Sequence, residues 1–164
     1  MTTTTASRVS FSSLTPNNIG TVRKLNSVLF PIKYTEKFYE GIINPQVEDF
    51  CKLVYYNDVP VGTICCRIES KDGEDNLYLM TMGVLAPYRT RGLGSQTLQQ
   101  ILTAASSHTT PAIKKIYLHV QISNGAAKRF YEKHGFKEVG IHKDYYKKIM
   151  PHHAWILEKT IEHS

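Results

Sequence analysis

The stretch Val84-Leu85-Ala86-Pro87-Tyr88-Arg89-Thr90-Arg91-Gly92-Leu93-Gly94-Ser95 joins a predicted strand to a predicted helix. Its glycines at 92 and 94 allow the backbone to curl, so that its N–H groups point toward one place. The first N–H groups of the following helix face the same way, with the positive end of the helix dipole. This pattern indicates a pyrophosphate site with Arg89 and Arg91 at its rim. The alternative is that the glycines only form a tight turn. The stretch lacks the features of a Walker loop or a dinucleotide-binding fingerprint.

The segments on either side of this stretch predict one α/β domain. Thr15-Pro16 and Thr35 are typical helix starts, Asn57-Asp58 is a turn between strands, and residues 71–76 form a polar loop. We expect strands at 8–14, 50–56, 61–68, 77–85, 114–122, 136–141 and 155–161, and helices from 15, from 35, from the glycine loop to 106, and over 124–133. The order β-α-α-β-β-β-α-β-α-β-β predicts a mixed sheet with helices on both faces. Residues 1–7 are predicted to be a flexible tail, and the domain to span 8–164.

Composition and charge narrow the class of protein. The 164 residues are 41% hydrophobic and 21% charged, which is typical of a globular chain, and no apolar stretch reaches the length of a membrane span. The net charge is +6, and the chain from residue 111 onward contains ten Lys and Arg but five Asp and Glu. This excess of basic residues favours an anionic partner; the alternative is that it only serves solubility. Cys51, Cys65 and Cys66 show no disulfide or metal spacing, so the sequence predicts a reducing compartment: the cytoplasm, with access to the nucleus.

Several stretches in addition to the loop carry a family resemblance. Arg89-Thr90-Arg91-Gly92-Leu93-Gly94 resembles the acetyl-CoA loop of the GNAT acetyltransferases, and Asn124–Ala127 with Phe130–Phe136 resembles the second cofactor segment of that family. Four more stretches are similar to the NatE-type N-terminal acetyltransferases of the family: residues 29–34, 77–81, 117–124 and 144–147. The resemblance covers about residues 8–160. It implies a GNAT fold with a mixed, mostly antiparallel sheet of about seven strands.

The resemblance also implies which residues bind acetyl-CoA. Backbone groups of Met82, Gly83 and Val84 would hold the pantetheine. The pyrophosphate would lie at the loop residues Arg89, Thr90, Arg91, Gly92, Leu93, Gly94 and Ser95. Asn124, Ala127 and Tyr131 would contact the distal part, with the Tyr131 phenol placed to protonate the leaving thiolate; its alternative role is helix packing. No metal is expected. Thr90 and Gly125 depart from the family pattern.

An amine must lose a proton before it attacks a thioester, and its pKa determines how strong a base is needed. A chain-terminal α-amine has a pKa of roughly 7.7–8.0, whereas a lysine side chain titrates at about 10.4, so the α-amine needs only a mild base. Residues 77–85 and 116–122 contain no carboxylate but do contain Tyr78 and His119. Each alone would be read as structural. The resemblance assigns this pair to water-mediated proton removal.

Two aromatic clusters are the candidate peptide-binding residues. Phe30, Pro31, Ile32 and Tyr34 lie between two predicted helices, and Tyr145, Tyr146 and Ile149 lie in a hairpin between the last two strands. The resemblance implies that these loops, with Met80, bind protein N-termini that begin with Met and a hydrophobic residue. The alternative for Tyr145 and Tyr146 is packing against the edge of the domain.

Three other functions remain open at this point. A lysine or polyamine acetyltransferase would keep the fold and change the acceptor. An inactive scaffold subunit would need neither the loop nor Tyr78 and His119. A nucleic-acid-binding module would rest on charge alone, and the basic residues are scattered, so we expect no direct nucleic acid and no membrane as partners. The resemblance implies association with the NatA complex and, through it, with the ribosome.

Overall fold

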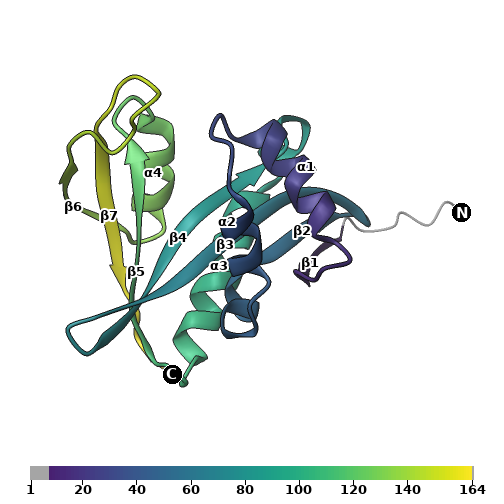
Figure 1. Cartoon of the computed structure of the whole chain (residues 1–164), viewed down its shortest axis with the longest axis horizontal. Coiled ribbons are helices and arrows are strands. Elements are labelled where there is room, and N and C mark those ends of the chain that lie inside the picture. Colours follow the sequence, from purple (N-terminus) through teal and green to yellow (C-terminus); the bar gives the residue numbers. More distant parts are fainter. Residues whose placement is uncertain (1–7, 164) are drawn as a thin grey trace, which may run out of the picture. The chain divides into compact units, whose positions relative to one another are not determined.

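The structure, a computed structural model, describes residues 8–163, so the predicted tail at 1–7 lies outside the described residues. The order of helices and strands is the predicted one (Figure 1). The structure adds two 3-10 helices, η1 and η2. The elements are β1 Val9–Ser13, α1 Ile19–Leu29, α2 Glu36–Ile42, η1 Pro45–Phe50, β2 Lys52–Tyr56, β3 Val59–Lys71, β4 Glu74–Val84, η2 Ala86–Arg91, α3 Leu93–Ser107, β5 Ile113–Gln121, α4 Gly125–Lys133, β6 Lys137–His142 and β7 Ala154–Thr160.

Seven strands form one mixed, mostly antiparallel sheet in the order β1-β2-β3-β4-β5-β7-β6. β4 and β5 pair in parallel, whereas β1 with β2, β2 with β3, β5 with β7 and β6 with β7 are antiparallel. The pairing of β4 with β5 runs from Asp75 opposite Ile113 to Tyr78 opposite Tyr117, while β4 itself continues to Val84. The predicted fold class is confirmed.

The chain folds into two compact units, each made of two segments. The first contains the chain up to Arg67 and Met80–Ala104, and the second contains Ile68–Leu79 and the chain from Ala105 onward. β3 and β4 contribute to both units, so neither unit is a continuous stretch of sequence.

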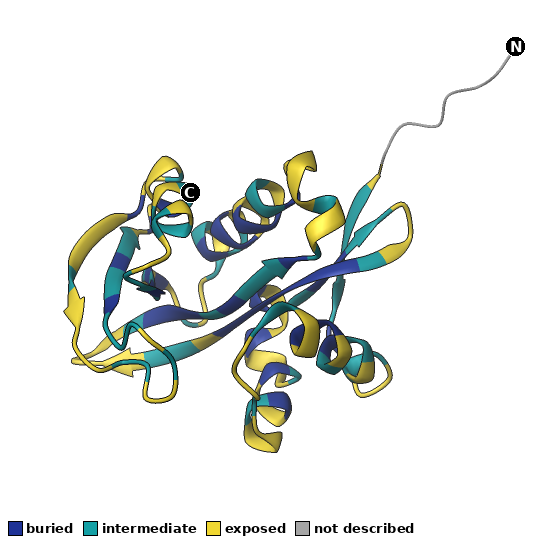
Figure 2. Cartoon of the chain, turned by 90° about the horizontal axis from the view of Figure 1, so that it is seen from above, coloured by how far each residue is buried: buried dark blue, intermediate teal, exposed yellow. Residues whose placement is uncertain are grey.

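The core of the first unit lies on two faces of its strands. Val84 packs with Leu93 at the start of α3, together with Val54 and Val61. The next position along β4, Gly83, faces the end of α1 instead. Because successive residues of a strand point to opposite faces, α1 and α3 cover opposite faces of this unit, as predicted. In Figure 2, the helices carry alternating buried and exposed segments, as amphipathic helices do when one side packs on a sheet.

In the second unit, the apolar residues of β5 alternate with more exposed ones. Ile116, Leu118 and Val120 are buried, whereas Tyr117 and His119 are half-buried. β5 therefore presents one apolar face and one face with polar and aromatic side chains, and the second face carries the candidate catalytic residue His119.

Two regions differ from the predicted bounds by three residues or more. Thr15 does not cap α1, which begins at Ile19 after Asn18, because Thr15 and Asn18 bond each other in a preceding turn: Thr15 N donates to Asn18 Oδ1 (2.8 Å) and Asn18 N to Thr15 O (3.1 Å). The predicted polar loop at 71–76 is also wrong. Asp72 and Gly73 have φ of 53° and 76°, as a two-residue hairpin turn of type I′ requires, so β3 and β4 run on to this turn.

Candidate active site

The structure places Tyr78, His119 and Tyr145 in direct contact. The Tyr78 hydroxyl lies 2.6 Å from His119 Nδ1 and 2.7 Å from the Tyr145 hydroxyl. Strand register explains the first contact, because Tyr78 of β4 is paired with Tyr117 of β5, and His119 follows two residues later on the same face. Tyr145 comes from the segment 143–153 that joins β6 to β7. A phenol and an imidazole at this distance are hydrogen-bonded, so a proton can pass between them, as general acid–base chemistry requires.

Ring packing fixes the orientation of these side chains. The His119 imidazole stacks on the Tyr145 ring, with centroids 4.1 Å apart and planes at 11°. The Tyr78 ring meets Tyr117 edge-on at 4.8 Å. Rings held on two sides lose little further freedom when a substrate binds, which favours a preorganised site.

The 143–153 segment is held by backbone bonds near Tyr146. Tyr146 N donates to His152 O (2.8 Å), and His152 Nδ1 lies 2.6 Å from Tyr146 O. Burial raises the pKa of Tyr146 to about 12, and the neighbouring Tyr145 adds to the shift. The Tyr146 hydroxyl therefore keeps its proton at neutral pH and can donate a hydrogen bond. Ile149, on the same segment, is half-buried.

Two further residues of this cluster escaped the sequence analysis. The Tyr117 hydroxyl donates to the carboxylate of Glu69, which lies on the part of β3 that the sequence analysis assigned to no strand. His142, the last residue of β6, places Nδ1 3.2 Å from His119 Nε2. The Asp72-Gly73 sequence could have indicated Glu69, because a two-residue turn there extends β3 through Glu69. Nothing in the local sequence indicates the second.

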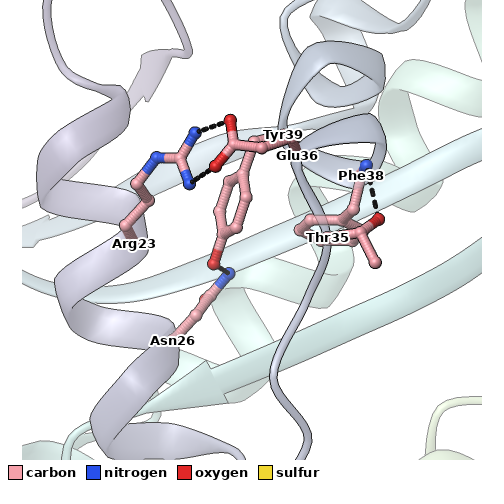
Figure 3. Close-up of polar contacts among 6 residues, drawn as sticks. All are labelled: Arg23, Asn26, Thr35, Glu36, Phe38 and Tyr39. Carbon is pink, nitrogen blue, oxygen red and sulfur yellow. Dashed lines mark hydrogen bonds and ion pairs between the residues drawn. The ribbon is translucent and has the colours of Figure 1, made fainter.

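The candidate peptide loop lies between α1 and α2, which polar contacts tie together (Figure 3). The two terminal nitrogens of the Arg23 guanidinium each lie 2.7 Å from an oxygen of the Glu36 carboxylate, and these bonds lower the pKa of that carboxyl. The same guanidinium lies 4.2 Å from the centre of the Tyr39 ring, and the Thr35 hydroxyl accepts from Phe38 N as the predicted cap. The loop is therefore held at both ends.

Within the loop, aromatic rings pack in a row. Tyr34 stacks on Phe38 at 4.5 Å and meets Phe30 edge-on at 6.2 Å. Pro31 and Ile32 are exposed. Phe30 and Tyr34 thus present half-buried rings beside an exposed apolar tip, the arrangement expected of a surface that receives an apolar side chain.

Phe30 also packs against β4 at one of the candidate cofactor residues. A Cβ on Gly83 would lie 3.0 Å from Phe30 Cζ and 3.2 Å from Leu29 Cδ1, closer than ordinary contacts. Glycine at position 83 therefore sets how closely the peptide loop approaches the strand.

We expect Gly83→Ala to displace the Phe30 ring by a few tenths of an ångström and to raise KM for the peptide about threefold to tenfold, as a misplaced binding group does. Steady-state kinetics with varied peptide concentration measures this. Gly20→Ala on α1 is the matched control, because a Cβ at Gly20 meets nothing within 4 Å. An unchanged KM in Gly83→Ala would show that the position of Phe30 does not matter to the peptide.

The glycine loop forms the predicted strand-to-helix junction. Gly92 has φ of 75°, a left-handed conformation that other residues rarely adopt, and Gln96 N donates the first helical bond of α3 to Gly92 O (3.1 Å). Both arginines contact protein groups: Arg89 Nε donates to Val84 O (2.9 Å), and Arg91 lies over the Tyr56 ring at 5.0 Å. Thr90 is exposed, and Leu93 is buried in the core. Arg89 and Arg91 thus directly precede the positive end of α3 in the chain, at the end of η2.

Three candidate cofactor residues belong to the second unit. Asn124 caps α4, because its Oδ1 accepts from Ala127 N (3.1 Å). Tyr131 is buried, and its ring lies 5.2 Å from Phe130 and 5.5 Å from Phe136. These contacts match the packing role that was weighed for Tyr131. Met80 and Met82 lie on β4 at the same side as Tyr78, two and four residues further on.

Three further observations concern the cysteine thiols, the groups that could bind a metal, and the helices. Burial raises the pKa of Cys51 to about 12 and raises the pKa of both Cys65 and Cys66, so the three thiols stay protonated. Over residues 8–163, no three His, Cys, Asp or Glu side chains are arranged to hold a metal ion. No helix of this described part has both the length and the apolar character that a membrane span needs.

Comparison with known proteins agrees with this geometry. The "Acetyltransferase (GNAT) family" matches residues 20–136. The chain is 42% identical to N-alpha-acetyltransferase 50 of Danio rerio over 94% of this chain and 89% of the relative, and 41% identical to the probable N-acetyltransferase san of Drosophila melanogaster over 96% and 83%.

A solved structure gives the same result. Arabidopsis thaliana Naa50, in complex with the bisubstrate analogue CoA-Ac-MVNAL, superimposes with a TM-score of 0.84 at 41% identity, covering 92% of this chain and 97% of the other. Fold and sequence thus agree. The chain belongs to the GNAT family of acetyltransferases and is an acetyltransferase enzyme homologous to N-alpha-acetyltransferase 50.

Proposed function

We propose that the protein transfers the acetyl group of acetyl-CoA to the α-amine of peptides that begin with Met followed by a hydrophobic residue. The observation that carries the proposal is the hydrogen-bonded chain from Tyr145 through Tyr78 to His119, with distances of 2.7 and 2.6 Å. Its imidazole group is a mild base to which the phenol can pass a proton, and a mild base suits an α-amine with a pKa of roughly 7.7–8.0.

The residues of the glycine loop fit acetyl-CoA. The left-handed turn at Gly92 joins η2, which ends with Arg89 and Arg91 in its last turn, to the positive end of α3, and this combination supports a pyrophosphate site. β4 continues through Met82–Val84 beyond its pairing with β5, so its backbone is proposed to bond the pantetheine. Gly94 and Ser95 would complete the phosphate site. When bound, acetyl-CoA supplies the thioester that the amine attacks.

Tyr78 and His119 are proposed to remove the proton from the amine, directly or through a water molecule. The Tyr78 hydroxyl is buried and lies within reach of both the imidazole and the Tyr145 hydroxyl, so a proton that it accepts passes to His119. Tyr131 is proposed to protonate the leaving thiolate, and Asn124 and Ala127 to contact the distal part of the cofactor.

The peptide is proposed to contact residues of both aromatic loops. Phe30, Pro31, Ile32, Tyr34 and Met80 would form the apolar walls, with Tyr145, Tyr146 and Ile149 on the other loop. The proposal is supported by the analogue bound to the Arabidopsis relative, whose peptide part, MVNAL, begins with Met and Val. The Tyr146 hydroxyl, which keeps its proton, is suited to donate to a peptide carbonyl.

Transfer is proposed to be direct, in a complex of enzyme, acetyl-CoA and peptide. An acetyl-enzyme would need an activated nucleophile, and burial raises the pKa of the three cysteine thiols. We also propose a cytoplasmic protein with access to the nucleus that associates with the NatA complex and, through it, the ribosome. The resemblance and the basic last third of the chain support this association.

The test compares acetyl transfer to three peptides: one that begins Met-Leu, one that begins Ser-Glu, and one with a blocked N-terminus and internal lysines. We expect kcat/KM to be about tenfold to a hundredfold higher for Met-Leu, as a filled apolar pocket allows. Preference for the lysine peptide would replace the proposed acceptor. Binding of acetyl-CoA without transfer to any peptide would instead indicate a scaffold.

A further inference from the structure

His142 is the exposed end of a chain of hydrogen bonds that begins at the proposed base. His119 contacts Tyr78 through Nδ1 at 2.6 Å and His142 through Nε2 at 3.2 Å. The rings of His119 and His142 lie 5.1 Å apart, and the His142 ring lies 5.1 Å from Tyr145. Both nitrogens of His119 are therefore engaged, each by a different side chain.

One hydrogen must lie between the two imidazoles, and its position sets the chemistry at Tyr78. If His119 Nε2 carries it and donates to His142 Nδ1, then the neutral His119 has a bare Nδ1 that accepts the Tyr78 hydroxyl proton. If His142 Nδ1 carries it, then His119 holds its own hydrogen on Nδ1 and cannot accept from Tyr78. Only the first arrangement lets His119 act as a base.

We propose that His142 is a positioning residue, whose neutral ring accepts the Nε2 hydrogen of His119 and so keeps His119 Nδ1 ready to take a proton from Tyr78. The inference rests on the proposed function, since it deepens the role of His119. In this step one proton moves from the amine to Tyr78 while the Tyr78 proton moves to His119 Nδ1, and only N–H and O–H bonds change.

The groups that face His142 come from three parts of the chain. His119 faces it from β5 and Tyr145 from the joining segment, while its partner on β7 is the uncharged Ala154. Lys143 and Asp144 follow it in the chain, and the Asp144 carboxylate lies 3.9 Å from His153 Nδ1. A proton on His142 makes its Nδ1 a donor, which reverses the bond to His119.

The first experiment reads the tautomer without any activity assay. Long-range proton–nitrogen NMR spectra of the 15N-labelled full chain at pH 8 distinguish the hydrogen on Nε2 from that on Nδ1. We expect His119 to carry it on Nε2 in the wild type and to show a mixture of both forms in His142→Phe, which keeps a ring but offers no acceptor. An unchanged His119 pattern in His142→Phe would overturn the proposal. His142→Ala provides the same comparison if the phenylalanine variant does not fold.

The second experiment is kinetic. We expect His142→Phe to lower kcat for the Met-Leu peptide between about twofold and tenfold, as the loss of one hydrogen bond does, with KM unchanged. His142→Asn should restore kcat, because its side-chain oxygen replaces the Nδ1 acceptor. Lys143→Gln, which removes a neighbouring charge, is the matched control.

The outcomes separate the two proposals. If the wild type acetylates no peptide, or His119→Ala is as active as the wild type, then the proposed function fails, while the NMR spectra still decide whether His142 holds the tautomer. If His119→Ala is impaired and His142→Phe keeps the wild-type kcat, then only the role of His142 is refuted.

Discussion

Replacing His119 with alanine should lower kcat about a hundredfold or more while the Kd for acetyl-CoA stays within about twofold, because a general base contributes roughly 10²–10⁴ to rate. The proposed cofactor contacts are made by other residues, so the loss should be confined to the chemical step. Single-turnover kinetics measures the step, and calorimetric titration with acetyl-CoA measures the binding.

Tyr78→Phe should lower kcat by a similar factor, because it removes the hydroxyl that contacts both His119 and Tyr145. The control is Tyr117→Phe, which removes a hydroxyl one strand away, bonded to Glu69 and outside this chain of contacts. Loss of acetyl-CoA binding in Tyr78→Phe or His119→Ala would show that these side chains support the cofactor site instead of the base.

The second large effect concerns stability. Asn26 and Thr63 are both buried, and the Thr63 hydroxyl donates to Asn26 Oδ1 at 2.9 Å. Asn26→Leu should lower the free energy of unfolding by about 2–4 kcal/mol, because it leaves the Thr63 hydroxyl buried without this partner and inserts a new shape into a packed core. Urea denaturation measures the change.

A double-mutant cycle identifies the cause. In Asn26→Leu with Thr63→Val, neither polar group remains, so the loss should be smaller than the sum of the two single losses by about 1 kcal/mol or more. Ser27→Ala, on the exposed side of α1, should change stability by less than about 0.5 kcal/mol and serves as the control. Strict additivity would show that the bond between Asn26 and Thr63 contributes no coupling.

Local signals in the sequence were enough for the features that depend on neighbouring residues. The order of elements, the Thr35 cap and the junction at Gly92 follow from residue type and spacing, and the structure has all three. The choice of Tyr78 and His119 as a catalytic pair came from the family resemblance, and the structure adds that the two side chains are in contact. These inferences needed no knowledge of distant contacts.

Features that depend on tertiary contacts were missed. The Glu69 carboxylate reaches Tyr117 only because β3 extends to the Asp72-Gly73 turn, which the sequence analysis assigned to a longer loop. His142 reaches His119 across β7, which lies between β6 and β5, so no spacing along the chain indicates it. Likewise, Thr15 has the residue type of a cap, but its reciprocal bonds with Asn18 delay the helix.

The close packing of Phe30 on Gly83 has a thermodynamic consequence. On the proposed assignment, one residue belongs to the peptide site and the other to the cofactor site, so the two ligands share a contact. Any change that one ligand makes in this contact alters the affinity for the other, and such linkage is reciprocal: acetyl-CoA and peptide change each other's affinity by the same factor. The strength of this coupling between acetyl-CoA and peptide then depends on a single aromatic ring packed against a glycine.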